Sequence, residues 1–62
     1  MLEVGFYKEL LSETIVEIIS INEGVVRWRT LNKKKFDGHI FEDKMSKIKT
    51  NYLEKLKNFE KN

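Results

Sequence analysis

The sequence predicts an α+β domain: a small bent antiparallel sheet of three to four strands with one long C-terminal helix packed across it. Two observations predict this fold. β-Branched residues and turn residues are concentrated in the first two-thirds of the chain, whereas the apolar residues of the last third recur at spacings of three and four. We therefore expect a single domain over residues 1–62, with the sheet at 4–42 and the helix at 44–59.

Two strands are expected near the start of the chain. Residues 4–9 fit a first strand interrupted by Gly5, although the apolar residues of 2–13 also fit one face of a helix. Residues 14–21 (TIVEIISI) form the clearer strand, because five of the eight are Ile or Val and such side chains pack well on a pleated sheet.

A hairpin is expected next, with a turn at Asn22-Glu23-Gly24 and a returning strand at 25–31 (VVRWRTL). Trp28 would point to the face opposite Arg27 and Arg29, because side chains alternate along a strand. The register depends on the length of the loop. A two-residue loop would place Ile19 and Ile21 on the face of Val26 and Trp28, and a three-residue loop would pair Ile18 with Trp28 and Glu17 with Arg29.

The second half of the chain predicts a loop, a turn, a short strand and a helix. The loop is at 33–35 (KKK), the turn at 36–38 (FDG) and the short strand at 39–42 (HIFE). Asp43 is a candidate helix N-cap, with Ser46 as a competitor. One face of the helix would carry an apolar stripe, formed by Met45, Ile48, Tyr52, Leu56 and Phe59, with Leu53 at its edge.

Two segments carry a resemblance to known folds. Val16-Glu17-Ile18-Ile19 and Val26-Arg27-Trp28-Arg29 are similar to two strand motifs of chromodomains, but the aromatic cage that reads methyl-lysine is mostly missing. With Gly5-Phe6-Tyr7, the pattern resembles the very small SH3-like β-barrel proteins of phages and prophages. This resemblance implies a non-enzymatic accessory protein that binds and modulates a protein partner, in the host cytoplasm if it is phage-encoded.

The distribution of charge offers an alternative function. Net charge is +2, with −2 on residues 1–31 and +4 on residues 32–62. Five cations lie within nine residues with no acid among them, and such a face could bind nucleic-acid phosphates or a protein partner. These residues are Arg27, Arg29, Lys33, Lys34 and Lys35. Their competing interpretation is a solvated strand edge, with Glu17 neutralising Arg29 across the hairpin.

Apolar residues give a second candidate contact surface. The end of the expected helix would overhang the small sheet and leave Leu53, Leu56 and Phe59 for a partner or for a second copy of the chain. Trp28 has two interpretations: the centre of the core, which we favour in so small a chain, or an exposed anchor for a partner.

Several functions are not expected. The chain has one histidine, His39, and no cysteine, so no nucleophile and base stand at a known catalytic spacing. Asp37, His39, Glu42 and Asp43 lack the spacing of a zinc or calcium site. We therefore expect no enzyme activity, no metal and no cofactor. The start of the chain has no signal-peptide pattern and no apolar run is long enough for a membrane helix, which predicts a cytoplasmic protein that is not membrane-bound.

Overall fold

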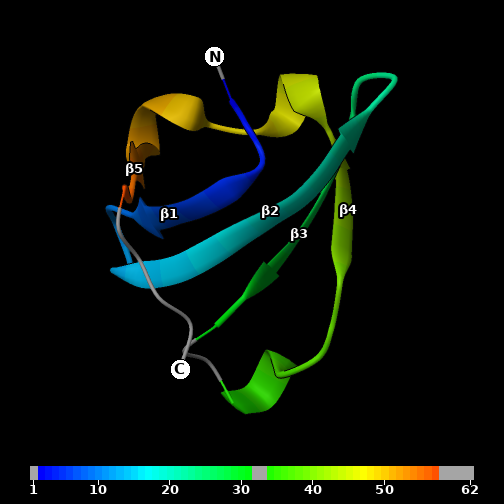
Figure 1. Cartoon of the computed structure of the whole chain (residues 1–62). Helices are drawn as coiled ribbons and strands as arrows, with labels where there is room; N and C mark the ends of the chain where they lie inside the picture. The colour runs from blue at the N-terminus through cyan, green and yellow to red at the C-terminus, as the bar shows by residue number, and fades with distance from the viewer. Residues whose placement is uncertain (1, 32–33, 58–62) are drawn as a thin grey trace.

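A computed structural model of the chain describes residues 2–31 and 34–57. These residues form one antiparallel sheet of five strands, in the spatial order β4-β3-β2-β1-β5 (Figure 1). Short 3-10 turns lie between the strands and are labelled η1 to η3. The strands are β1 (Gly5–Glu9), β2 (Thr14–Asn22), β3 (Val25–Thr30), β4 (Phe41–Lys44) and β5 (Leu53–Lys55), and the turns are η1 (Lys34–Phe36), η2 (Met45–Lys47) and η3 (Thr50–Tyr52).

The first three strands begin and end within one residue of those predicted from the sequence. The fourth begins two residues later than predicted, at Phe41, after a turn in which Gly38 has a φ of 81°. A positive φ favours glycine because it has no Cβ. The strand signals of the sequence were therefore sufficient for the four-stranded part of the sheet.

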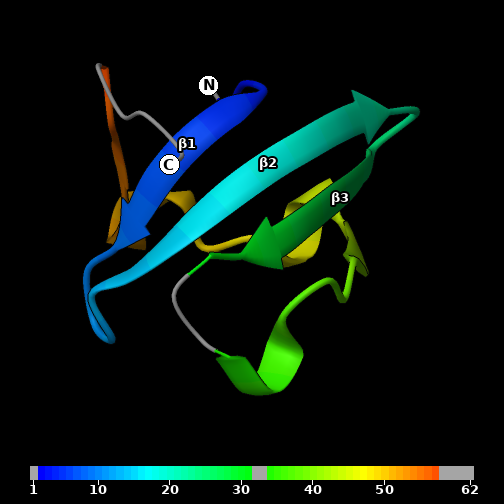
Figure 2. The same cartoon turned by 60° about the horizontal axis from the view of Figure 1, so that its bottom comes forward.

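The prediction of an α+β fold with a long C-terminal helix at 44–59 is wrong, and the described chain is mostly β. Its part of that segment, residues 44–57, contains the end of β4, η2, η3 and β5. In Figure 1 the segment between β4 and β5 crosses the top of the sheet, and β5 then lies beside β1. Figure 2 shows the same arrangement from a turned view.

Three physical reasons explain why the helix does not form. Thr50, Asn51 and Tyr52 lie in the middle of the segment and have low helix propensity. Asp43, the expected N-cap, accepts a hydrogen bond from Trp28 Nε1 instead. The backbone of β1 would also keep an unpaired edge without β5. Tertiary pairing therefore overrides the helical spacing of the apolar residues.

The register of the β2–β3 hairpin combines both alternatives. Asn22 pairs with Val25, so the loop has two residues, and both have positive φ: 51° at Glu23 and 76° at Gly24. A bulge at Ile19 then shifts the register by one residue. Beyond it, the pairs are Ile18–Trp28 and Glu17–Arg29, as the longer loop would have given.

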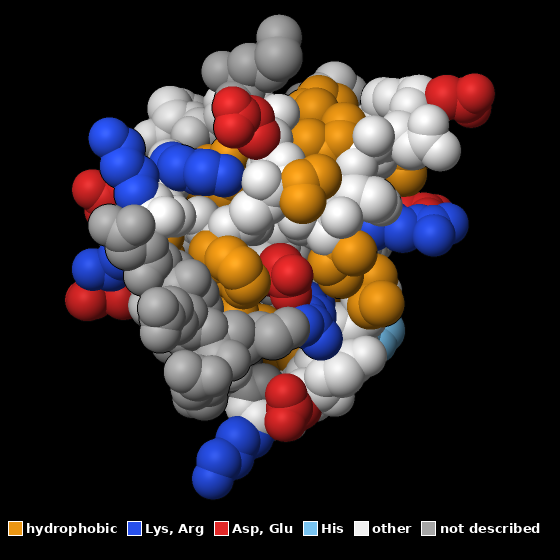
Figure 3. Space-filling model, in the orientation of Figure 1, with side chains coloured by type: hydrophobic (Ala, Val, Ile, Leu, Met, Phe, Trp, Pro, Cys, Tyr) orange, Lys and Arg blue, Asp and Glu red, His pale blue; other side chains and the backbone are white. Residues whose placement is uncertain are grey.

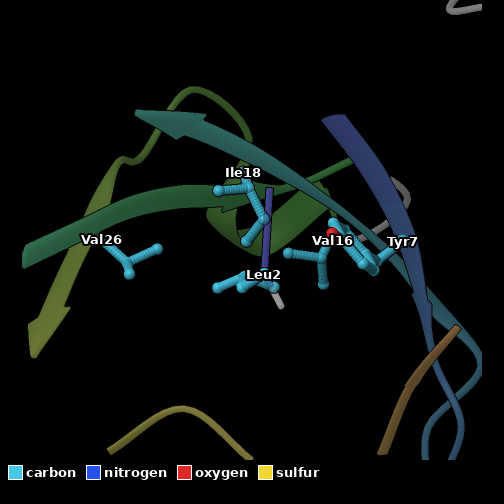
Figure 4. Close-up of a cluster of buried hydrophobic side chains, with 5 residues drawn as sticks. All are labelled: Leu2, Tyr7, Val16, Ile18 and Val26. Carbon is cyan, nitrogen blue, oxygen red and sulfur yellow. The ribbon is translucent and has the colours of Figure 1, made fainter. Parts of the chain in front are cut away.

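The core lies on the concave face of the sheet (Figure 4). Its buried apolar members come from β1, from alternate positions of β2, from β3 and from the segment that precedes β1, and they point toward one another. Ile18 and Val26 are the most deeply buried. The buried apolar residues are Leu2, Tyr7, Val16, Ile18 and Val26, against which Ile21, Trp28, Met45, Ile48 and Leu53 pack.

Candidate binding groove

A groove of about 220 Å³ opens beside the core, between β3 and β4 on one side and the segment after η2 on the other. We call it the Trp28 groove. Its lining comes from every strand, from the end of η2 and from the connection between η2 and η3. The lining residues are Glu9, Val16, Ile18, Trp28, Asp43, Lys47, Ile48, Lys49 and Leu53.

The floor of the Trp28 groove is apolar because three segments of the chain contribute aliphatic side chains to it. Val16 and Ile18 are two residues apart on β2 and therefore share a face. Ile48 follows η2, three residues after Met45, and a 3-10 turn has about three residues, so both side chains return to the core. Leu53 adds the start of β5.

Trp28 forms a wall whose orientation is fixed by two contacts. Its ring stacks on Phe41, the residue opposite it on β4, with the centroids 4.4 Å apart and the planes 18° apart. Its Nε1 donates to Asp43 Oδ2 at 2.9 Å. Phe36 and His39 pack edge-on against Phe41. Trp28 is thus half-buried. It packs on the core, as one interpretation of the sequence expected, and it also lines an open groove, as an exposed anchor would.

The acidic and basic side chains at the rim of the groove differ in how far other groups of the chain compensate their charges. Its two carboxylates are engaged within the chain: Glu9 Oε1 accepts the Ser12 N–H at 2.7 Å, and Asp43 accepts from Trp28. Lys47 and Lys49 are exposed, and neither ammonium group forms an ion pair among residues 2–31 and 34–57. The groove therefore has an apolar floor and, at its rim, two positive charges that no ion pair within the described residues compensates.

The predicted basic face is present in part but is largely neutralised. Arg27 and Arg29 project from the same face of β3, and each donates through Nε to a neighbouring strand. Arg27 meets Glu42 Oε2 at 2.8 Å, and Arg29 meets Glu17 Oε1 at 2.7 Å. Glu17 thus lies where the competing interpretation of the sequence placed it.

Lys34 and Lys35 of that predicted face are not part of these two ion pairs. Lys34 and Lys35 are exposed in η1, and Lys35 Nζ is 5.5 Å from the centroid of the Phe36 ring. Lys33 lies outside the described residues. Two of the five predicted cations are therefore already paired with carboxylates.

The predicted apolar contact surface loses its basis with the helix. Leu53 belongs to β5 and packs against the core, so it lines the Trp28 groove instead of an exposed helix end. The backbone N–H of Leu56 donates to Phe6 O at 2.9 Å, which extends the contact of β5 with β1. Phe59 lies outside the described residues.

Sequence reasoning did not place Lys47 and Lys49 at a groove, because it predicted a helix over 44–59. A detectable signal was present: both lysines flank Ile48 at alternate positions. In the structure these three residues all line the groove.

A second hollow of about 380 Å³ lies on the other side of η3 and is lined in part by Leu2, Tyr7 and Lys55. Its cation is engaged: Lys55 Nζ lies 4.9 Å from the centroid of the Tyr7 ring and donates to Val4 O at 3.2 Å. The Tyr7 hydroxyl accepts the Glu3 N–H. The polar groups here therefore hold the N-terminal segment against β5.

The surface in the orientation of Figure 1 has hydrophobic side chains in separate patches, with acidic and basic side chains between them (Figure 3).

Within the described ranges, no three His, Cys, Asp or Glu side chains gather as a metal site. No helix in the same part of the chain has the length and hydrophobicity needed to cross a membrane. No family model, curated protein or solved structure matches the chain.

Proposed function

We propose that this chain is a small SH3-like β-barrel protein that binds a protein partner through the Trp28 groove. The barrel assignment is supported by the order β4-β3-β2-β1-β5, in which the last strand returns to pair with the first. The observation that carries the binding function is an apolar groove with a fixed tryptophan wall at its side. Tryptophan in such a position is a frequent anchor of protein interfaces.

The volume of the groove selects the kind of ligand. Sites for drug-sized molecules occupy about 300–1,000 Å³, whereas a cavity of about 150 Å³ already holds benzene. The Trp28 groove, at about 220 Å³, is therefore suited to one or two apolar side chains of a protein segment. Because the ring of Trp28 is held by Phe41 and Asp43, little side-chain freedom is lost on binding.

The charges at the rim define the residues that flank this apolar side chain. Lys47 and Lys49 attract carboxylates, while Glu9 and Asp43 are occupied by hydrogen bonds from Ser12 and Trp28. The partner segment should thus present Leu, Ile or Phe next to Asp or Glu. Electrostatic complementarity of this kind contributes to specificity and to the association rate.

Selection from a random peptide library on the immobilised full chain tests this proposal. We expect enriched peptides with an acidic residue beside an apolar one, and a change in the fluorescence of Trp28, which is the only tryptophan. Lys47→Glu with Lys49→Glu should weaken binding about tenfold or more. The matched control is Lys34→Glu with Lys35→Glu, a pair exposed in η1 that should have little effect.

The same two double variants and a third, Arg27→Ala with Arg29→Ala, distinguish the alternative function, which is binding to nucleic-acid phosphates. That function predicts binding of single- or double-stranded DNA that falls steeply with salt. It also predicts that Lys34→Glu with Lys35→Glu, or Arg27→Ala with Arg29→Ala, removes this binding. Peptides that bind equally well to the Lys47/Lys49 variant would contradict the groove proposal.

A further inference from the structure

A second exposed feature has the chemistry that the Trp28 groove requires. The turn between β1 and β2 carries Leu10 and Leu11, of which 47% and 75% are exposed. Glu9 and Glu13 lie on either side of them in the sequence. The chain therefore presents two apolar side chains between two carboxylates, which matches the segment expected in the groove.

The turn that carries Leu10 and Leu11 is held rigidly by polar contacts. Glu9 Oε1 accepts the Ser12 N–H at 2.7 Å, and the Ser12 hydroxyl is hydrogen-bonded both to Glu9 Oε1 and to Thr14 Oγ1. The Glu13 N–H donates to Glu9 O at 2.7 Å. These bonds fix the backbone that displays the leucines, so insertion into a partner would require little further ordering.

The carboxylate of Glu13 remains accessible, whereas that of Glu9 is bonded to Ser12. The side chain of Glu13 is 78% exposed, and its ion pair with Lys8 is long, at 3.8 Å. A long, exposed ion pair exchanges readily with another cation. Lys47 and Lys49, at the rim of the groove, are cations of the required sign with no ion-pair partner in the described part of the chain.

Turn and groove are also neighbours on the surface. Glu9 begins the turn and lines the groove, and the Leu10 N–H donates to Tyr52 O at 2.9 Å, next to Leu53 of the groove. When a protruding element lies beside the site that accepts it, a two-fold axis between two copies lets each insert into the other, and the assembly closes.

From these observations we propose that a second copy of the chain occupies the Trp28 groove with Leu10 and Leu11, forming a two-fold dimer. Glu13 of one copy lies against Lys49 of the other in this dimer, and the same contact occurs twice. The dimer rests on the proposed function of the groove, and it would compete with any other protein partner for the same site.

Analytical ultracentrifugation of the full chain from about 10 μM to about 1 mM tests the dimer, because weak self-association falls in this range. Leu11→Ser should raise the dissociation constant roughly tenfold or more. Ile40→Ser is the matched control, because Ile40 is 53% exposed but neither belongs to the turn nor lines the groove. A wild-type chain that stays monomeric throughout, or a dimer that Leu11→Ser leaves unchanged, would overturn the proposal.

A charge exchange gives the sharper test. Glu13→Lys and Lys49→Glu should each weaken the homodimer, because each places like charges at both contacts. When the two variants are mixed, a heterodimer has opposite charges at both contacts, so dimerisation should return to near the wild-type level. No recovery on mixing would contradict the two-fold arrangement. If wild-type chain is monomeric yet binds the selected peptides, only the dimer fails; if it does neither, the groove function fails as well.

Discussion

Trp28 and Asp43 are joined across the β3–β4 pair by a hydrogen bond from Nε1 to Oδ2 of 2.9 Å. Asp43 lies opposite Val26, two residues along β4 from Phe41, the direct neighbour of Trp28. Both contacts of the indole ring thus lie on the same face of β4, because residues two apart share a face. One strand of four residues orients the wall of the groove.

Removing this hydrogen bond should loosen the indole ring without unfolding the chain. We expect Asp43→Ala to lower the free energy of unfolding by about 1 kcal/mol, since a single exposed hydrogen bond contributes little more. The emission of Trp28 should move to longer wavelength. Urea titration followed by fluorescence measures both effects. Asp37→Ala, in the exposed turn before β4, is the control and should change neither.

The two buried threonines should respond to substitution by valine with opposite signs. Thr30 is 8% exposed, and its Oγ1 has no hydrogen-bond partner among the described residues, whereas Oγ1 of Thr14 is bonded to Ser12. Thr30→Val removes an unsatisfied hydroxyl and should stabilise the chain by about 1 kcal/mol, while Thr14→Val should destabilise it by a similar amount. Thermal unfolding would show it, and a loss of stability in Thr30→Val would contradict the expectation.

The tight turn between β2 and β3 contains a strained glutamate. Glu23 has a φ of 51° and Gly24 a φ of 76°, and Asn-Gly is the sequence that such a two-residue turn prefers. Glu23→Asn should therefore raise the free energy of unfolding by about 0.5–1 kcal/mol, because asparagine tolerates positive φ better than glutamate. Gly24→Ala should lower it. Equal stability of both variants, measured by urea unfolding, would argue against this turn.

The two arginine ion pairs should differ in strength although their distances are alike. The Arg29 and Glu17 side chains are 30% and 22% exposed, whereas Arg27 and Glu42 are 61% and 56% exposed. Double-mutant cycles to alanine should give a coupling of about 0–1 kcal/mol for Arg27–Glu42, and a larger one for Arg29–Glu17 that survives better in salt. The cycle cancels the other contacts of Glu17. A larger coupling for the exposed pair would contradict the placement of these side chains.

Local signals were enough to predict much of the sheet. The β-branched run of β2, the turn at 22–24 and the strand ending near Thr30 are all encoded by neighbouring residues. The register could not be settled by the loop alone, because a bulge at Ile19 changes the pairing halfway along the hairpin. Sequence alternation gives no sign of a bulge in a stretch such as TIVEIISI, where both faces are apolar.

The C-terminal third could not be predicted from local signals. Met45 and Ile48 have a spacing that fits both an α-helix and a 3-10 turn, and the tertiary contacts of Asp43 and of the β1 edge contribute to the choice between them. The candidate site was missed for the same reason. Leu53 and Lys49 line the same groove as Trp28 because the chain after β4 crosses to β1 through η2 and η3 in place of a helix. Arg27 and Arg29, by contrast, were placed correctly on one face of β3.

The pairing of β5 with β1 has a consequence for how the protein is made. Tyr7 is paired with Lys55, about fifty positions later, so the first strand keeps one bare edge until the last has been synthesised. The meander of β1 to β4 pairs only strands that are neighbours in the sequence, so it can form before β5 pairs with β1. Long-range pairing of this kind is slow. The unfinished sheet is thus a species on which a chaperone, or another nascent chain, can act first.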